Sequence, residues 1–99
     1  MTDLNKQQLQ FLKKLTHPLK PVVRTGQHGL TNAVLVELDK ALIHHELIKI
    51  KIGAADRDER DAILARMLEK SGSALVQQVG GTAVLFRRNK KKPMIELPR

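Results

Sequence analysis

Cysteine, tyrosine and tryptophan are all missing from this 99-residue chain, and phenylalanine occurs only twice. Without cysteine there is no disulfide framework, no thiolate nucleophile and no cysteine-based zinc site. Two aromatic residues are too few for the stacking platforms with which RRM and OB folds read bases. If the protein binds nucleic acid, it must therefore rely on backbone, shape and loop contacts.

Long apolar runs are also lacking, since no stretch approaches the roughly 20 apolar residues of a membrane span. The first six residues do not have the basic-then-apolar order of a signal peptide. We find no phosphate-binding P-loop and no nucleophile elbow. These absences predict a cytoplasmic protein with no membrane partner, no cofactor, no small-molecule substrate and no enzymatic activity.

Positive charge is in excess. The 18 Lys and Arg residues outnumber the 10 Asp and Glu residues, which gives a formal net charge of +8 and a sequence pI near 10.2. The field of such a surface favours polyanionic partners. Charge alone suits DNA, RNA and an anionic membrane equally well. The length fits one domain over residues 1–99, with a basic tail from about residue 88.

Apolar periodicity predicts seven elements in the order α-β-α-β-α-β-β. The first helix covers 3–16, with Thr2 or Asp3 as its cap, and Thr31 or Asn32 caps the second. The third helix opens at 56–59 and ends near Gly72. The expected strands are 21–24, 47–52, 74–79 and 82–87, and a Gly80-Gly81 turn that permits positive φ joins the last two.

Isoleucine and lysine alternate along 47–52, so the isoleucines face a core while Lys49 and Lys51 point away from it. The helices are therefore expected on one face of the sheet, with the other face at least partly open. Right-handed crossovers and a final hairpin then build a two-layer α/β sandwich with a mixed four-stranded sheet.

Two glycines three residues apart, Gly26 and Gly29, bracket the turn between the first strand and the second helix. They let an extended backbone approach closely, beside the free N–H groups and positive dipole end of the helix. In a basic domain, a phosphate backbone is the natural ligand of such a turn. The alternative is an ordinary turn that only needs flexible φ.

The turn Gly26-Gln27-His28-Gly29-Leu30-Thr31 is followed by Leu38, Ala41-Leu42 and His45-Glu46-Leu47-Ile48-Lys49-Ile50-Lys51. Through these residues, nearly the whole chain resembles the CRM (YhbY) domain family. The resemblance implies an RNA-binding module similar in fold to the C-terminal domain of translation initiation factor three. Bacterial members are associated with precursors of the large ribosomal subunit, which implies a role in ribosome assembly. The family often has lysine where this chain has Gln27.

We predict that the RNA-binding residues lie in the turn, beside it, on the open sheet face and in the tail. They are Gly26, Gln27, His28, Gly29, Thr31, Lys20, Arg24, Lys49, Lys51, Arg87, Arg88, Lys90, Lys91 and Lys92. Any single lysine among them could simply be a solvated surface residue, and the tail could be disordered. Three basic clusters in a domain this small favour a polyanion-binding surface.

Two other motifs are interpreted as structural. His44 and His45 are adjacent on a helix, point about 100° apart and so would not share a metal. Asp56, Asp58 and Glu59 fit the first turn of a helix better than a catalytic or magnesium site. No catalytic or metal-binding residue is therefore predicted.

The leading hypothesis is a monomeric RNA-binding protein that acts without catalysis on large-subunit ribosomal RNA precursors. One alternative is a protein–protein adapter on the ribosome that uses the apolar hairpin or the first helix. Another is a general nucleic-acid binder that also takes duplex DNA. Salt dependence separates the adapter from the binders, because phosphate-dominated affinity falls steeply with salt.

Overall fold

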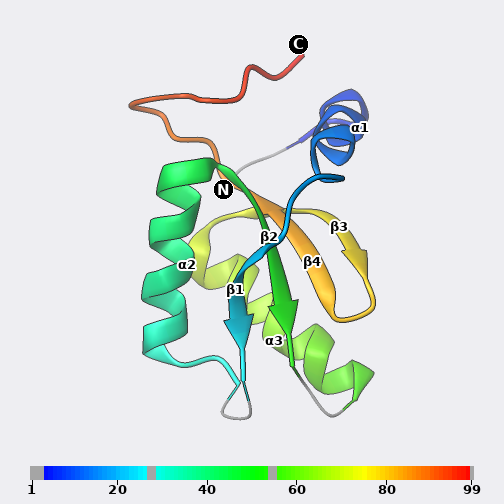
Figure 1. Cartoon of the computed structure of the whole chain (residues 1–99), viewed down its shortest axis with the longest axis vertical. Coiled ribbons are helices and arrows are strands. Elements are labelled where there is room, and N and C mark those ends of the chain that lie inside the picture. The colour runs from blue at the N-terminus through cyan, green and yellow to red at the C-terminus, as the bar shows by residue number, and fades with distance from the viewer. Residues whose placement is uncertain (1–3, 27–28, 54–55, 99) are drawn as a thin grey trace.

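The computed structural model describes residues 4–26, 29–53 and 56–98. Figure 1 shows the described elements, which are three helices and a four-stranded sheet. Along the chain they are α1 Lys6–Leu15, β1 Pro21–Thr25, α2 Asn32–His45, β2 Leu47–Ile52, α3 Arg57–Ser71, β3 Ala74–Val79 and β4 Thr82–Phe86. The predicted order and the mixed sheet are confirmed.

Helix α1 starts later than the sequence pattern suggested. Asn5 is its N-cap: the Asn5 side chain accepts from the Gln8 N–H at 2.8 Å, and the Gln8 side chain accepts from the Asn5 N–H at 3.0 Å. This reciprocal capping box satisfies two N–H groups that would otherwise lack partners. The prediction of a helix from residue 3 was therefore wrong, and Thr2 and Asp3 lie outside the described residues.

The α2 cap is one of the two predicted residues, whereas Asp56, predicted within the first turn of the third helix, is the N-cap of α3. The Thr31 hydroxyl accepts from the Val34 N–H at 3.2 Å at the start of α2, and Asp56 accepts from the Glu59 N–H at 2.8 Å at the start of α3. Gly72 ends α3 in the left-handed conformation, with φ 67°, as expected of a glycine cap. In the hairpin turn only Gly80 has a positive φ.

The sheet has the strand order β1-β2-β4-β3. Strands β1 and β2 are parallel, and β4 is antiparallel to both β2 and β3. The second strand of the hairpin thus lies between β2 and β3, in the interior of the sheet. Its run from Ala83 to Phe86 is buried at every position, as is typical of a strand covered on both faces.

Helices α2 and α3 cover one face of the sheet. Ile48, Ile50 and Ile52 pack there with Leu38 and Met67 in the main core, so the alternation of isoleucine and lysine was interpreted correctly. Complete burial of such a side chain stabilises the fold by about 1.5–3 kcal/mol relative to its exposure.

The opposite face is covered at one end only. Leu12 of α1 packs on Leu47 and Phe86, and Ile95 and Leu97 of the C-terminal segment join this second cluster. The Gln8 side-chain amide donates to the Pro98 carbonyl at 3.0 Å, which holds the segment beside α1. The uncovered end is the one where β1 and β2 finish and the turn 26–29 begins (Figure 1).

Candidate nucleic-acid interface

The uncovered end of the sheet carries the cations that the alternating pattern predicted. Arg24 of β1 pairs with Lys51 of β2, and Lys51 pairs with Thr82 of β4, so these three side chains lie side by side on one face. Lys49 lies on the same face, opposite Val84. Arg24 and Lys51 are exposed and Lys49 is half-buried. We call this surface, formed by Arg24, Lys49, Lys51 and Thr82, the open sheet face.

A shallow hollow of about 280 Å³ lies on this surface. Its lining consists of Lys49, Gln77, Val79, Thr82 and Val84. The side chains come from three adjacent strands, and they combine an aliphatic floor with amide, hydroxyl and ammonium groups. Such a floor lets a sugar or a base approach while the ammonium group contacts a phosphate.

The turn 26–29 leaves β1 beside the open sheet face. The Gly29 N–H donates to the Gly26 carbonyl at 3.0 Å, which closes the turn at its base. Gly29 has φ 68°, a conformation that glycine adopts without strain. At Gly26 an added Cβ would meet no atom within 4 Å, so the backbone there is open to an approaching partner.

The base of this turn is tied to the neighbouring strand. The Gly53 N–H donates to the buried Thr25 at both its hydroxyl, at 3.1 Å, and its carbonyl, at 3.3 Å. An added Cβ on Gly53 would lie 3.0 Å from that carbonyl, so a residue with a side chain would force this close contact to shift. The ends of β1 and β2 therefore hold the turn beside Arg24 and Lys51. Gln27 and His28, predicted to contact RNA, lie outside the described residues.

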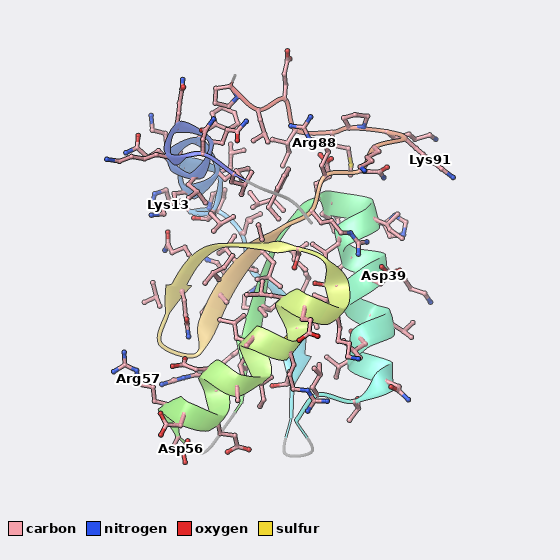
Figure 2. All side chains as sticks on the ribbon, turned by 180° about the vertical axis from the view of Figure 1, so that it is seen from behind. Lys13, Asp39, Asp56, Arg57, Arg88 and Lys91 are labelled. Atoms are coloured by element: carbon pink, nitrogen blue, oxygen red, sulfur yellow. The ribbon has the colours of Figure 1, made fainter. Side chains whose placement is uncertain are left out.

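The predicted residues do not form one cluster. The turn and the basic segment 88–92 lie at opposite ends of a molecule 39 Å long (Figure 1), and Figure 2 shows Arg88 and Lys91 at the end away from the turn. Lys20 precedes β1 and is exposed. Gly26, Gly29, Arg24, Lys49 and Lys51 come together, whereas Arg88, Lys90, Lys91 and Lys92 form a separate cluster.

Arg87 has internal partners. One guanidinium nitrogen donates to the Asp39 carboxylate at 2.9 Å and to the Ser71 carbonyl at 2.8 Å, and the other donates to the Asp39 carbonyl at 3.3 Å. These bonds tie the end of β4 to α2 and to the last turn of α3. We therefore treat Arg87 as a structural residue and leave it out of the interface.

Replacing Arg87 by glutamine should lower the free energy of unfolding by about 1–3 kcal/mol, because the Ser71 carbonyl and the Asp39 carboxylate lose a charged donor. The matched control is Arg88→Gln, since Arg88 is exposed, and it should change the stability by less than about 0.5 kcal/mol. Urea unfolding followed by circular dichroism measures both. Equal stability of the two variants would contradict the structural role of Arg87.

Glu46 is a central residue that the sequence interpretation missed. It is fully buried at the end of α2, and its carboxylate accepts three backbone N–H bonds: from Asn89 at 2.7 Å, Met94 at 2.8 Å and Ile95 at 2.7 Å. Its carbonyl accepts from the Arg87 N–H at 2.9 Å. The chain after β4 is therefore ordered around this carboxylate. The partners lie more than forty residues away in sequence, so only the tertiary structure identifies them.

The two adjacent histidines lie on the surface at the end of α2. His44 and His45 are both exposed, with ring centroids 6.4 Å apart. Within residues 4–26, 29–53 and 56–98, no group of three or more His, Asp or Glu side chains is placed to hold a metal. Over the same residues, no helix is both long and apolar enough to cross a membrane.

A family model decides the classification. The model of the CRS1 / YhbY (CRM) domain matches residues 4–87, from the residue before the α1 cap to Arg87, the residue after β4. This chain belongs to the CRM domain family. The match contains the turn 26–29 and the open sheet face, whereas the cluster 88–92 lies beyond it.

Two relatives named as RNA-binding proteins match this chain over nearly all of its length. An RNA-binding protein of Haemophilus influenzae is 46% identical over 99 residues, which is 100% of this chain and 99% of the relative. The probable RNA-binding protein YqeI of Bacillus subtilis is 30% identical over 95 residues, covering 96% of this chain and 99% of the relative.

A solved structure shares the CRM fold described above. The solution structure of the hypothetical protein SAV1595 from Staphylococcus aureus has a TM-score of 0.82 and 29% sequence identity. The match covers 97% of this chain and all of that one. The fold class predicted from the sequence is therefore confirmed.

Proposed function

We propose that this protein is a non-catalytic RNA-binding protein whose main contact is the open sheet face together with the turn 26–29. The observation that carries the proposal is the side-by-side placement of Arg24 and Lys51 on an uncovered sheet face, directly beside a glycine turn whose base is closed by the Gly29–Gly26 hydrogen bond. Membership of the CRM family and relatives named as RNA-binding proteins support it.

The chemistry of this surface matches a ribose–phosphate strand. Arg24 and Lys51 supply cations for successive phosphates, and the backbone at Gly26 admits the strand closely. The start of α2 lies beside the same turn and favours anions through its free N–H groups. The hollow with Lys49, Gln77 and Thr82 supplies polar partners for the 2′-hydroxyl, which is the group that distinguishes RNA from DNA.

Precursor RNA of the large ribosomal subunit is our proposed target, and assistance in ribosome assembly in the cytoplasm is the proposed role. The protein would act as a monomer, with no cofactor. The support is the family membership and the strongly basic surface. Crosslinking of the protein to RNA in cells, followed by sequencing of the bound fragments, tests the target. We expect enrichment of large-subunit precursor RNA, and an even distribution over all transcripts would contradict it.

Binding in solution should depend steeply on salt. If Arg24, Lys49 and Lys51 each neutralise one phosphate, the logarithm of the affinity for single-stranded RNA should fall with the logarithm of salt concentration with a slope of about −2. Fluorescence anisotropy with a labelled oligoribonucleotide measures the slope. A slope near zero would instead favour the adapter hypothesis. Duplex DNA bound as tightly as RNA at the same salt concentration would favour a general nucleic-acid binder.

A further inference from the structure

A second surface lies at the other end of the molecule, where segment 88–92 passes over the end of α2. Arg88, Lys90, Lys91 and Lys92 are all exposed there. The segment is not a loose basic tail, because the Asn89 side chain accepts from the Lys91 and Lys92 N–H groups at 3.1 Å each and donates to the Ile43 carbonyl at 3.2 Å. Glu46 holds the chain on both sides of these lysines, at Asn89 and at Met94.

Between this segment and α2 lies a groove of about 480 Å³, which we call the tail groove. Its lining consists of Leu42, Ile43 and residues 87–92. Ile43 is 46% exposed and supplies an aliphatic floor, while the cationic side chains surround it. The volume lies within the range of small-ligand sites. An apolar floor with a cationic rim fits a flat heterocycle that carries a phosphate on each side.

We propose that the tail groove seats one unpaired RNA nucleotide, with its base on Ile43 and its phosphates on Lys90, Lys91 and Lys92. This inference rests on the proposed function, and it adds a second contact separate from the open sheet face. Charge complementarity selects the occupant, because four exposed cations surround the groove and the described residues lining it include no carboxylate. Arg88 adds a guanidinium plane on which a base can stack.

The two contacts lie at opposite ends of a molecule 39 Å long, so a single RNA can occupy both only if it spans that length. Occupancy of one contact then raises the effective concentration of RNA at the other. A short oligoribonucleotide would occupy only one contact at a time. The tail groove should therefore contribute most to the affinity for long RNA with unpaired segments.

The test compares Ile43→Ser with Val36→Ser in the full chain. Val36 is the matched control because it lies on the same helix, is also an exposed aliphatic residue, at 54%, and does not line the tail groove. The probe is a long single-stranded RNA containing 4-thiouridine. Affinity is measured by anisotropy, and photo-crosslinked peptides are identified by mass spectrometry.

We expect Ile43→Ser to weaken the affinity for the long RNA about fivefold to tenfold and to remove crosslinks to segment 88–92, while Val36→Ser behaves as wild type. Equal behaviour of Ile43→Ser and wild type, or equal loss in both variants, would overturn the inference. Binding of an acidic peptide that depends on Ile43, with RNA binding unchanged, would also overturn it. In each case the proposed function stands if wild type binds RNA through Arg24 and Lys51, and it fails only if that binding is absent.

Discussion

Replacing Glu46 by glutamine should lower the free energy of unfolding by about 2 kcal/mol and free the chain that follows β4. Glutamine keeps one acceptor oxygen but presents an NH₂ group in place of the other oxygen. Either the Asn89 N–H or the pair from Met94 and Ile95 then faces a donor in a buried site. A buried donor without an acceptor costs about 1–3 kcal/mol.

Hydrogen exchange reports this change locally. The Asn89, Met94 and Ile95 amides should exchange faster in Glu46→Gln than in wild type. The amides of the β2–β4 ladder should lose only the protection that the lower free energy of global unfolding accounts for. The matched control is Glu37→Gln, because Glu37 is exposed on the same helix. Unchanged protection at all three amides in Glu46→Gln would show that the carboxylate does not organise the tail.

The backbone of Glu46 allows a second comparison at the same residue. Glu46 is the one non-glycine residue with positive φ among those described, with φ 59° and ψ −47°. Side chains with a Cβ carry a strain of roughly 1 kcal/mol or more in this region, and glycine does not. Both Glu46→Ala and Glu46→Gly lose the carboxylate. Glu46→Ala should nevertheless be less stable than Glu46→Gly by about 1 kcal/mol, and the reverse order would contradict the strain.

Much of the fold could be predicted because local patterns agree with the tertiary structure. The alternation through Ile48, Lys49 and Ile50 gave the correct faces of β2, and the glycine at 72 marked the end of α3. The covering of the second face was harder to predict. Two features of the sequence indicate that the second face is covered: the adjacent apolar pair Leu47-Ile48 and the continuous apolar run in β4. Both patterns favour burial on two faces of the sheet.

The candidate site could be predicted only in part. Lys49 and Lys51 follow from strand periodicity, and Arg24 from its place just before the turn. Arg24 and Lys51 are neighbours because of the parallel register of β1 and β2, and no local sequence pattern specifies that register. Arg87 shows the opposite error: charge made it a candidate for RNA contact, but its partners Asp39 and Ser71 come from helices distant in sequence.

Reversing two charges on the open sheet face, in the double variant Arg24→Glu/Lys51→Glu, should weaken RNA affinity about 100-fold or more at moderate salt. Two phosphate contacts are lost and two repulsive carboxylates replace them beside the turn. A 100-fold loss corresponds to about 2.7 kcal/mol of binding free energy. Both side chains are exposed, so the unfolding free energy should remain close to that of wild type.

The matched control is Lys40→Glu/Lys70→Glu, which lowers the formal net charge from +8 by the same amount. Lys40 and Lys70 line a hollow between α2 and α3, on the helical side of the sheet. Long-range attraction weakens equally in the two double variants, because they carry the same net charge. The difference between their affinities therefore isolates direct contact at the open sheet face. Equal losses in both would mean that RNA follows the overall field of the molecule and that Arg24 and Lys51 do not bind it directly.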